Sequence, residues 1–131
     1  MIGLNTNVIV RYIAQDDVVQ SAQATNIIES LSAEGPGFIT LVSVVELVLV
    51  MQGCYKASKE ECIAILQTLL RTREILTENA EVTLMSLNQD STSNADFADC
   101  LIERSAHYFK CSSTMTFDSN AAKTAGMQLI E

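Results

Sequence analysis

Short apolar runs alternate with longer helical segments along this chain of 131 residues. Runs too short for helices predict strands at 2–4, 38–40, 113–117 and 127–130, with a short strand or bridge at 74–77. Short strands that alternate with helices are typical of an α/β fold with a mostly parallel sheet. The length suits a single domain over 1–131, and 48% apolar residues can fill its core.

Helices are predicted between these runs, over 8–14, 18–33, 41–51, 59–72, 78–89, 95–108 and 119–125. The clearest start signal is Ser58, which forms the S-x-x-E pattern of a capping box with Glu61. The run 41–51 is rich in β-branched residues, but its length and its isolated Glu46 favour a helix over a strand. We expect this helix to be capped near Ser43.

Two further local features are predicted from polar residues. The first helix is expected to be capped by Thr6 or Asn7, because both can accept a hydrogen bond from the first turn. The polar stretch 90–94 is expected to form a loop before the helix at 95–108.

Composition excludes several classes of protein. No run approaches 18 apolar residues, so no membrane span is expected, and the start has no basic region of a signal peptide. The four cysteines form no C-x-x-C pattern and are predicted to be buried or half-buried free thiols, which favours a cytoplasmic location. A net charge of −8 argues against broad electrostatic binding of nucleic acid. It leaves open an RNA held through metal ions, or a basic protein partner.

A pair of carboxylates, Asp96 and Asp99, is the most distinctive polar feature. Their spacing of three places them on one face of the predicted helix, one turn apart. No Lys or Arg occurs between Arg73 and Arg104, so no nearby cation in the sequence relieves their repulsion. A divalent cation is one way to neutralise such a pair, and a solvated acidic face is the alternative.

Other candidate ligands follow strands or lie on helices. Asn5 and Asp118 come directly after predicted strands, where ligand sites of parallel sheets gather. Glu46 lies in an apolar helix, and a buried, unpaired carboxylate there would cost several kcal/mol. The alternatives are that Glu46 reaches solvent or a backbone amide and that Asp118 caps the last helix, although capping and metal binding are compatible. Converging oxygen ligands suit Mg²⁺ or Mn²⁺.

Four segments, in order, resemble the PIN-domain nucleases and specifically the VapC-type toxins of toxin–antitoxin pairs: 1–7, 44–47, 95–102 and 116–118. The likeness covers essentially the whole chain in order, spacing and length. It implies a three-layer α/β/α sandwich that is usually a homodimer. It also implies Mg²⁺- or Mn²⁺-dependent cleavage of RNA by a metal-activated water.

The resemblance also assigns site residues. Glu46, Asp99 and Asp118 match three of the family's four acidic positions, and Asp96 matches an additional acidic position. Thr6 and Thr116 match polar residues beside the site.

The fourth acidic position holds Asn5, where the family has Asp. Asn offers a carbonyl oxygen, but it is neutral and brings an NH₂ donor that repels a cation. We expect an intact fold, weaker metal binding and activity lower by orders of magnitude. A natural loss of the acid and an engineered inactivation would leave the same residue here.

The resemblance implies a VapB-type antitoxin as partner, in a toxin–antitoxin hetero-oligomer. Its tail would enter the acidic groove with a basic side chain, and segments between 18 and 70 would supply apolar contacts. A PIN fold that only binds antitoxin or RNA remains an alternative because of Asn5. A phosphoacceptor receiver domain fits poorly, because 5–7 contains no acid and Lys123 is badly placed. The only histidine, His107, is predicted at a helix end or the surface rather than as a catalytic base.

Overall fold

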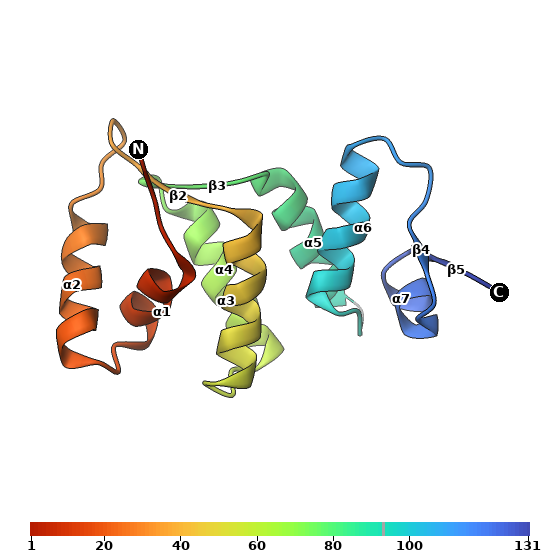
Figure 1. The fold of residues 1–131 in the computed structure, drawn as a ribbon, viewed down its shortest axis with the longest axis horizontal. Coiled ribbons are helices and arrows are strands. Elements are labelled where there is room, and N and C mark those ends of the chain that lie inside the picture. The colour runs from red at the N-terminus through yellow and green to blue at the C-terminus, as the bar shows by residue number, and fades with distance from the viewer. Residues whose placement is uncertain (93) are drawn as a thin grey trace. The chain divides into compact units, whose positions relative to one another are not determined.

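The computed structural model describes residues 1–92 and 94–131, and the side chains of all of these except 90–92 (Figure 1). The chain divides into two compact units, 1–78 and 79–131, and each is described by itself. In the part of the chain that the structure describes, no helix has the length and apolar character needed to cross a membrane.

The first unit contains a parallel sheet and four helices. Its strands β1 (Ile2–Gly3), β2 (Gly37–Ile39) and β3 (Ile75–Thr77) pair in the order β1-β2-β3. Its helices are α1 (Thr6–Ala14), α2 (Val18–Glu29), α3 (Leu41–Gly53) and α4 (Lys59–Arg71). Helix α1 packs on α2 and α3, and α3 packs on α4.

Buried aliphatic side chains hold these elements together. Ile9 of α1, Ile39 of β2, and Val44 and Leu47 of α3 are almost fully buried. Each such side chain contributes about 1.5–3 kcal/mol when it leaves water. This packing fixes the start of α1 and the middle of α3, which carry Asn5 and Glu46.

The helix starts in the first unit follow local capping, and two of the predicted caps are wrong. The capping box of Ser58 and Glu61 is confirmed, with both of its hydrogen bonds present. Helix α3 is capped by Thr40 rather than Ser43, because the Thr40 hydroxyl accepts from the backbone N–H of Ser43. Helix α1 begins one residue earlier than the predicted caps allow, so Asn5 occupies its N-cap position.

The second unit contains α5 (Ala80–Thr92), α6 (Phe97–Tyr108), β4 (Met115–Thr116), α7 (Ser119–Thr124) and β5 (Gln128–Leu129). Strands β4 and β5 form a two-stranded parallel sheet, and α5 packs on α6. A small apolar cluster forms part of its core: Ala95, Cys100, Ala121, Ala125 and Met127. Gly126 links α7 to β5 with a φ of 78°, a left-handed conformation that favours glycine.

The α/β class with short parallel strands is confirmed, and the described strands pair in two groups, one in each unit. Some boundaries differ from the prediction. The helix predicted over 18–33 ends at Glu29, and the helix predicted over 78–89 starts at Ala80 and continues to Thr92. The predicted loop at 90–94 is therefore wrong for 90–92, and residue 93 lies outside the described residues.

The prediction for the cysteines is half right. Cys62 and Cys100 are buried, whereas Cys54 and Cys111 are exposed. Cys54 is the C-cap residue of α3, and Cys111 follows the end of α6, so neither lies on a packed helix face. None of these four described cysteines forms a disulfide.

Candidate active site

The first group of candidate residues lies in the first unit, where β1 meets α1. The hydrogen bond from the Leu4 backbone N–H to the Phe38 carbonyl, 2.9 Å, extends the pairing with β2 up to Asn5. Asn5 is exposed, and its side chain makes no capping hydrogen bond to α1. Its backbone is thus fixed by its neighbours while its side chain has no part in holding the helix.

Glu46 is positioned by Thr6. Thr6 is only 6% exposed, and its Oγ1 donates to Glu46 Oε1 at 3.0 Å. Glu46 itself is exposed on α3, so the alternative that it reaches solvent is right, and no cost of burial has to be explained. Because the donor is neutral, this hydrogen bond orients the carboxylate without compensating its charge.

The second group lies in the second unit, at the start of α6. Asp96 is the N-cap residue, and its Oδ1 accepts from the Asp99 backbone N–H at 3.1 Å. Helix α6 begins at Phe97 rather than at 95, so Asp96 precedes the helix and Asp99 lies in its first turn. The two residues are close, as their spacing predicts, and a capping hydrogen bond joins them. An Asp directly before a helical pattern is the signal that predicts such a cap.

Asp118 has a matching position at the start of α7. Its Oδ1 accepts from the backbone N–H groups of Asn120 and Ala121, at 2.8 and 3.3 Å, which confirms that Asp118 caps the last helix. Its own backbone N–H donates to Thr116 Oγ1 at 3.0 Å. Thr116 therefore fixes the backbone that carries the Asp118 carboxylate.

Electrostatics link the acids of the second unit. Burial raises the pKa of Asp99, and the negative charges of Asp96 and Asp118 raise it further. No ion pair of the described residues involves any of these three carboxylates. The surroundings of the Asp99 carboxylate therefore disfavour its negative charge, and a bound cation would favour that charge.

The donor chemistry fits a hard divalent cation, since carboxylate and amide oxygens are the ligands that Mg²⁺ and Mn²⁺ prefer. Within the described ranges 1–92 and 94–131, no three His, Cys, Asp or Glu side chains lie close enough together to hold a metal ion. In the first unit, the structure thus places Thr6 beside Glu46. In the second unit, it places Asp96 beside Asp99 and Thr116 beside Asp118.

The two roles of Asp118 are separable by substitution. Asp118→Asn keeps an oxygen that accepts from the start of α7, so we expect little loss of stability. Asp118→Ala removes the cap and should cost about 1 kcal/mol of unfolding free energy. Urea unfolding of both variants measures this difference, and an Asn variant as unstable as the Ala variant would show that the charge of Asp118, and not its hydrogen bonds, supports α7.

Comparison with known proteins gives one match. A sequence profile of the PIN domain matches residues 2–127, which is nearly the whole chain. A search of curated proteins finds no match. Because the profile spans both groups of acidic residues and the strands and helices that carry them, the chain belongs to the PIN domain family.

Proposed function

We propose that this chain is a divalent-metal-dependent endoribonuclease of the VapC toxin type, weakened by Asn5. The observation that carries the proposal is the Asp99 carboxylate, whose pKa is raised by burial and by Asp96 and Asp118. PIN domains are commonly metal-dependent nucleases, and an acidic cluster without a protein cation suits that chemistry.

In this proposal residues 1–131 form a single PIN domain, and the metal ligands are those that the family resemblance assigns. Glu46, Asp99 and Asp118 would hold Mg²⁺ or Mn²⁺, and Asn5 would offer a carbonyl oxygen. Asp96 adds negative charge beside Asp99. When bound, such an ion supplies positive charge beside the scissile phosphate and makes water more acidic.

The other residues of the site act by positioning. Thr6 holds Glu46 through its hydroxyl, so that the carboxylate is oriented before an ion arrives. Thr116 accepts from the Asp118 backbone N–H and keeps the end of β4 in place. Ligands held in place in this way lose little conformational entropy on binding, which favours a defined coordination geometry.

An antitoxin of VapB type, a homodimer and a cytoplasmic location complete the proposal. The proposal of an antitoxin is supported by an apolar pocket of the first unit, which has a volume of about 330 Å³ and lies between α1, α2 and α4. The residues that help to line it are Tyr12, Ile13, Ile28, Ile65 and Leu69. An apolar antitoxin segment fits this pocket, and a basic side chain of the same partner fits the carboxylates.

A second candidate function follows from Asn5 alone. A PIN fold that lacks one of its acids can bind RNA or antitoxin without cutting. Metal binding separates the two candidates, because a nuclease site requires the ion and a purely structural one does not.

The test is cleavage of a mixed pool of RNA by the Asn5→Asp form with Mn²⁺. We expect cleavage that EDTA stops, and we expect Glu46→Gln in the same form to lose it while remaining folded. The matched control is Glu60→Gln, which neutralises an exposed acid at the start of α4. If the Asn5→Asp form binds Mn²⁺ but cuts no RNA, the endoribonuclease proposal is wrong. If it binds RNA but no Mn²⁺, the binding-only function is favoured.

A further inference from the structure

One aromatic side chain stands in solvent directly beside a candidate ligand. Phe117 is 83% exposed, and it lies between β4 and Asp118. By contrast, Phe97 is buried at the start of α6, and Phe109 packs edge-on against Tyr108 with ring centroids 5.3 Å apart. In the part of the chain that the structure describes, Phe117 has no aromatic partner. Leaving a phenyl ring in water forfeits about 1.5–3 kcal/mol of burial.

The backbone on either side of Phe117 is fixed. Thr116 pairs with Leu129 of β5 and also accepts from the Asp118 N–H. Asp118 is extended and is tied to the start of α7 by two hydrogen bonds. The ring is therefore presented from a rigid base, so that a contact with it costs little ordering of the chain.

Phe117 is next to a candidate ligand in the sequence but is not itself a ligand. It occupies a bend directly after β4, which ends at Thr116, and its phenyl ring has no donor atom for an ion at Asp118. The Phe117 ring can instead contact a part of a bound molecule that lies next to the part held at Asp118.

The net negative charge of the second unit disfavours contacts with the phosphates of an RNA. Residues 79–131 contain three Lys or Arg and seven Asp or Glu. Of the three basic residues, Arg104 donates to Gln89 at 3.2 Å and pairs with Glu103 at 3.5 Å. An RNA strand at Asp118 thus needs contacts that do not depend on charge, and stacking of a base on an aromatic ring is such a contact.

We propose that Phe117 is a substrate-positioning residue whose ring stacks on an unpaired RNA base beside the phosphate held at Asp118. The inference rests on the proposed function and adds a requirement for single-stranded RNA at this place, because a base in a duplex has no free face. Stacking is worth about 1–3 kcal/mol per base and tolerates any base. The site would therefore select unpaired structure more strongly than sequence.

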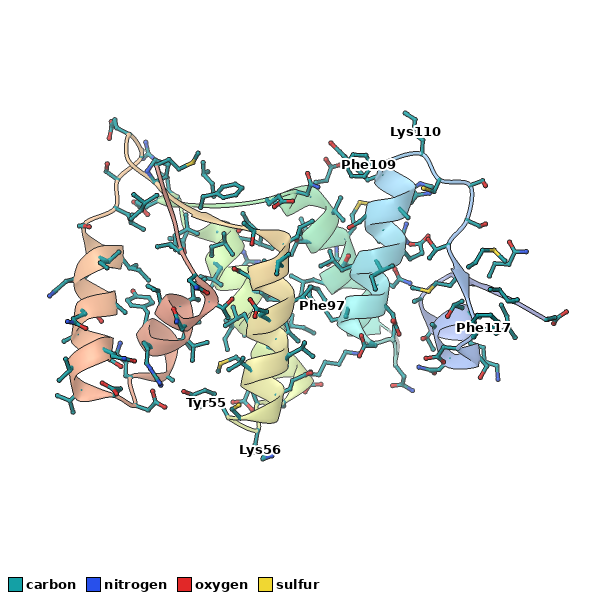
Figure 2. The ribbon with its side chains drawn as sticks, in the orientation of Figure 1. Tyr55, Lys56, Phe97, Phe109, Lys110 and Phe117 are labelled. Atoms are coloured by element: carbon teal, nitrogen blue, oxygen red, sulfur yellow. The ribbon has the colours of Figure 1, made fainter. Side chains whose placement is uncertain are left out.

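The first test uses fluorescence. The chain contains no Trp, so Phe117→Trp creates a single reporter at this position. We expect saturable quenching of its emission by a single-stranded RNA of mixed sequence, about 12 nucleotides long, with Ca²⁺ present. The control is Phe109→Trp, at the other end of the second unit beside the end of α6 (Figure 2), which should not be quenched. RNA that binds Phe117→Trp, as measured by filter retention, without quenching would overturn the inference.

The second test uses kinetics in the Asn5→Asp form. Phe117→Ala should raise KM for single-stranded RNA about 10- to 100-fold with a smaller change in kcat, and Phe117→Tyr should restore KM to within a few-fold. Phe109→Ala should leave both constants unchanged. An unchanged KM for Phe117→Ala, in an enzyme that still cuts RNA, overturns this inference and leaves the proposed function standing. If the Asn5→Asp form neither binds nor cuts RNA, the proposed function fails, and this inference fails with it.

Discussion

Asn5→Asp should raise Mn²⁺-dependent RNA cleavage by about two to three orders of magnitude, the size of effect that one electrostatic group in an active site commonly has. The substitution is nearly isosteric and replaces a neutral amide with a carboxylate opposite a divalent cation. Asn5 is exposed and its side chain makes no capping bond, so no existing interaction is lost. Asp is as good an N-cap residue as Asn, and thermal melting should be nearly unchanged.

The control for this gain is Asn7→Asp. Asn7 is also exposed, and it lies two residues further along, in the first turn of α1. The variant adds the same charge to the same helix start without occupying the family's acidic position. Both variants are compared by cleavage rate and by the Mn²⁺ concentration at half-maximal rate. Equal rates for the two variants, or no gain for either, would show that position 5 is not a metal ligand.

Asp99→Asn, made in the Asn5→Asp form, should reduce cleavage at least about 100-fold and stabilise the metal-free protein. The pKa of Asp99 is raised by burial and by two neighbouring carboxylates. A carboxyl with a raised pKa stabilises the fold fully only below its unfolded value of about 3.9, and that contribution is lost as pH rises through the folded value. At neutral pH the neutral Asn should therefore give a higher melting temperature.

The pH dependence makes this second prediction specific. The gain in melting temperature should be present at pH 7 and should vanish below about pH 3.9, where Asp99 is protonated in both states. Mn²⁺ should raise the melting temperature of the parent more than that of Asp99→Asn. Glu81→Gln, in the first turn of α5, is the control, and it should be neutral or slightly destabilising because it removes an acid from a helix start. A lower melting temperature for metal-free Asp99→Asn at pH 7 contradicts the prediction.

Local patterns in the sequence predicted the features that depend on neighbouring residues. The capping box at Ser58 and the cap at Asp118 need only residues within three positions, and both are confirmed. The helix over 41–51 was predicted against β propensity from its length and its isolated Glu46. The alternation of strands and helices was sufficient to predict the α/β class.

Features decided by competing polar side chains were predicted less well. Thr40 and Ser43 are both good caps, and only the backbone conformation shows that Thr40 is extended and accepts from Ser43. The early end of α2 coincides with Ser30, whose hydroxyl donates to the Ile27 carbonyl. The pairing of Thr6 with Glu46 spans 40 residues, so no local pattern encodes it.

The three N-cap positions among the candidate residues differ in what a substitution would disturb. Asp96 and Asp118 each hold the start of a helix with a side-chain oxygen, whereas the Asn5 side chain holds nothing. Replacing Asp96 or Asp118 with most other residues would therefore destabilise the fold as well as change the site. A substitution at position 5 changes the site and leaves the stability of the fold nearly unchanged. Under the proposed function, position 5 is therefore the one among these caps at which a single codon change would switch activity off or restore it without any compensating mutation elsewhere.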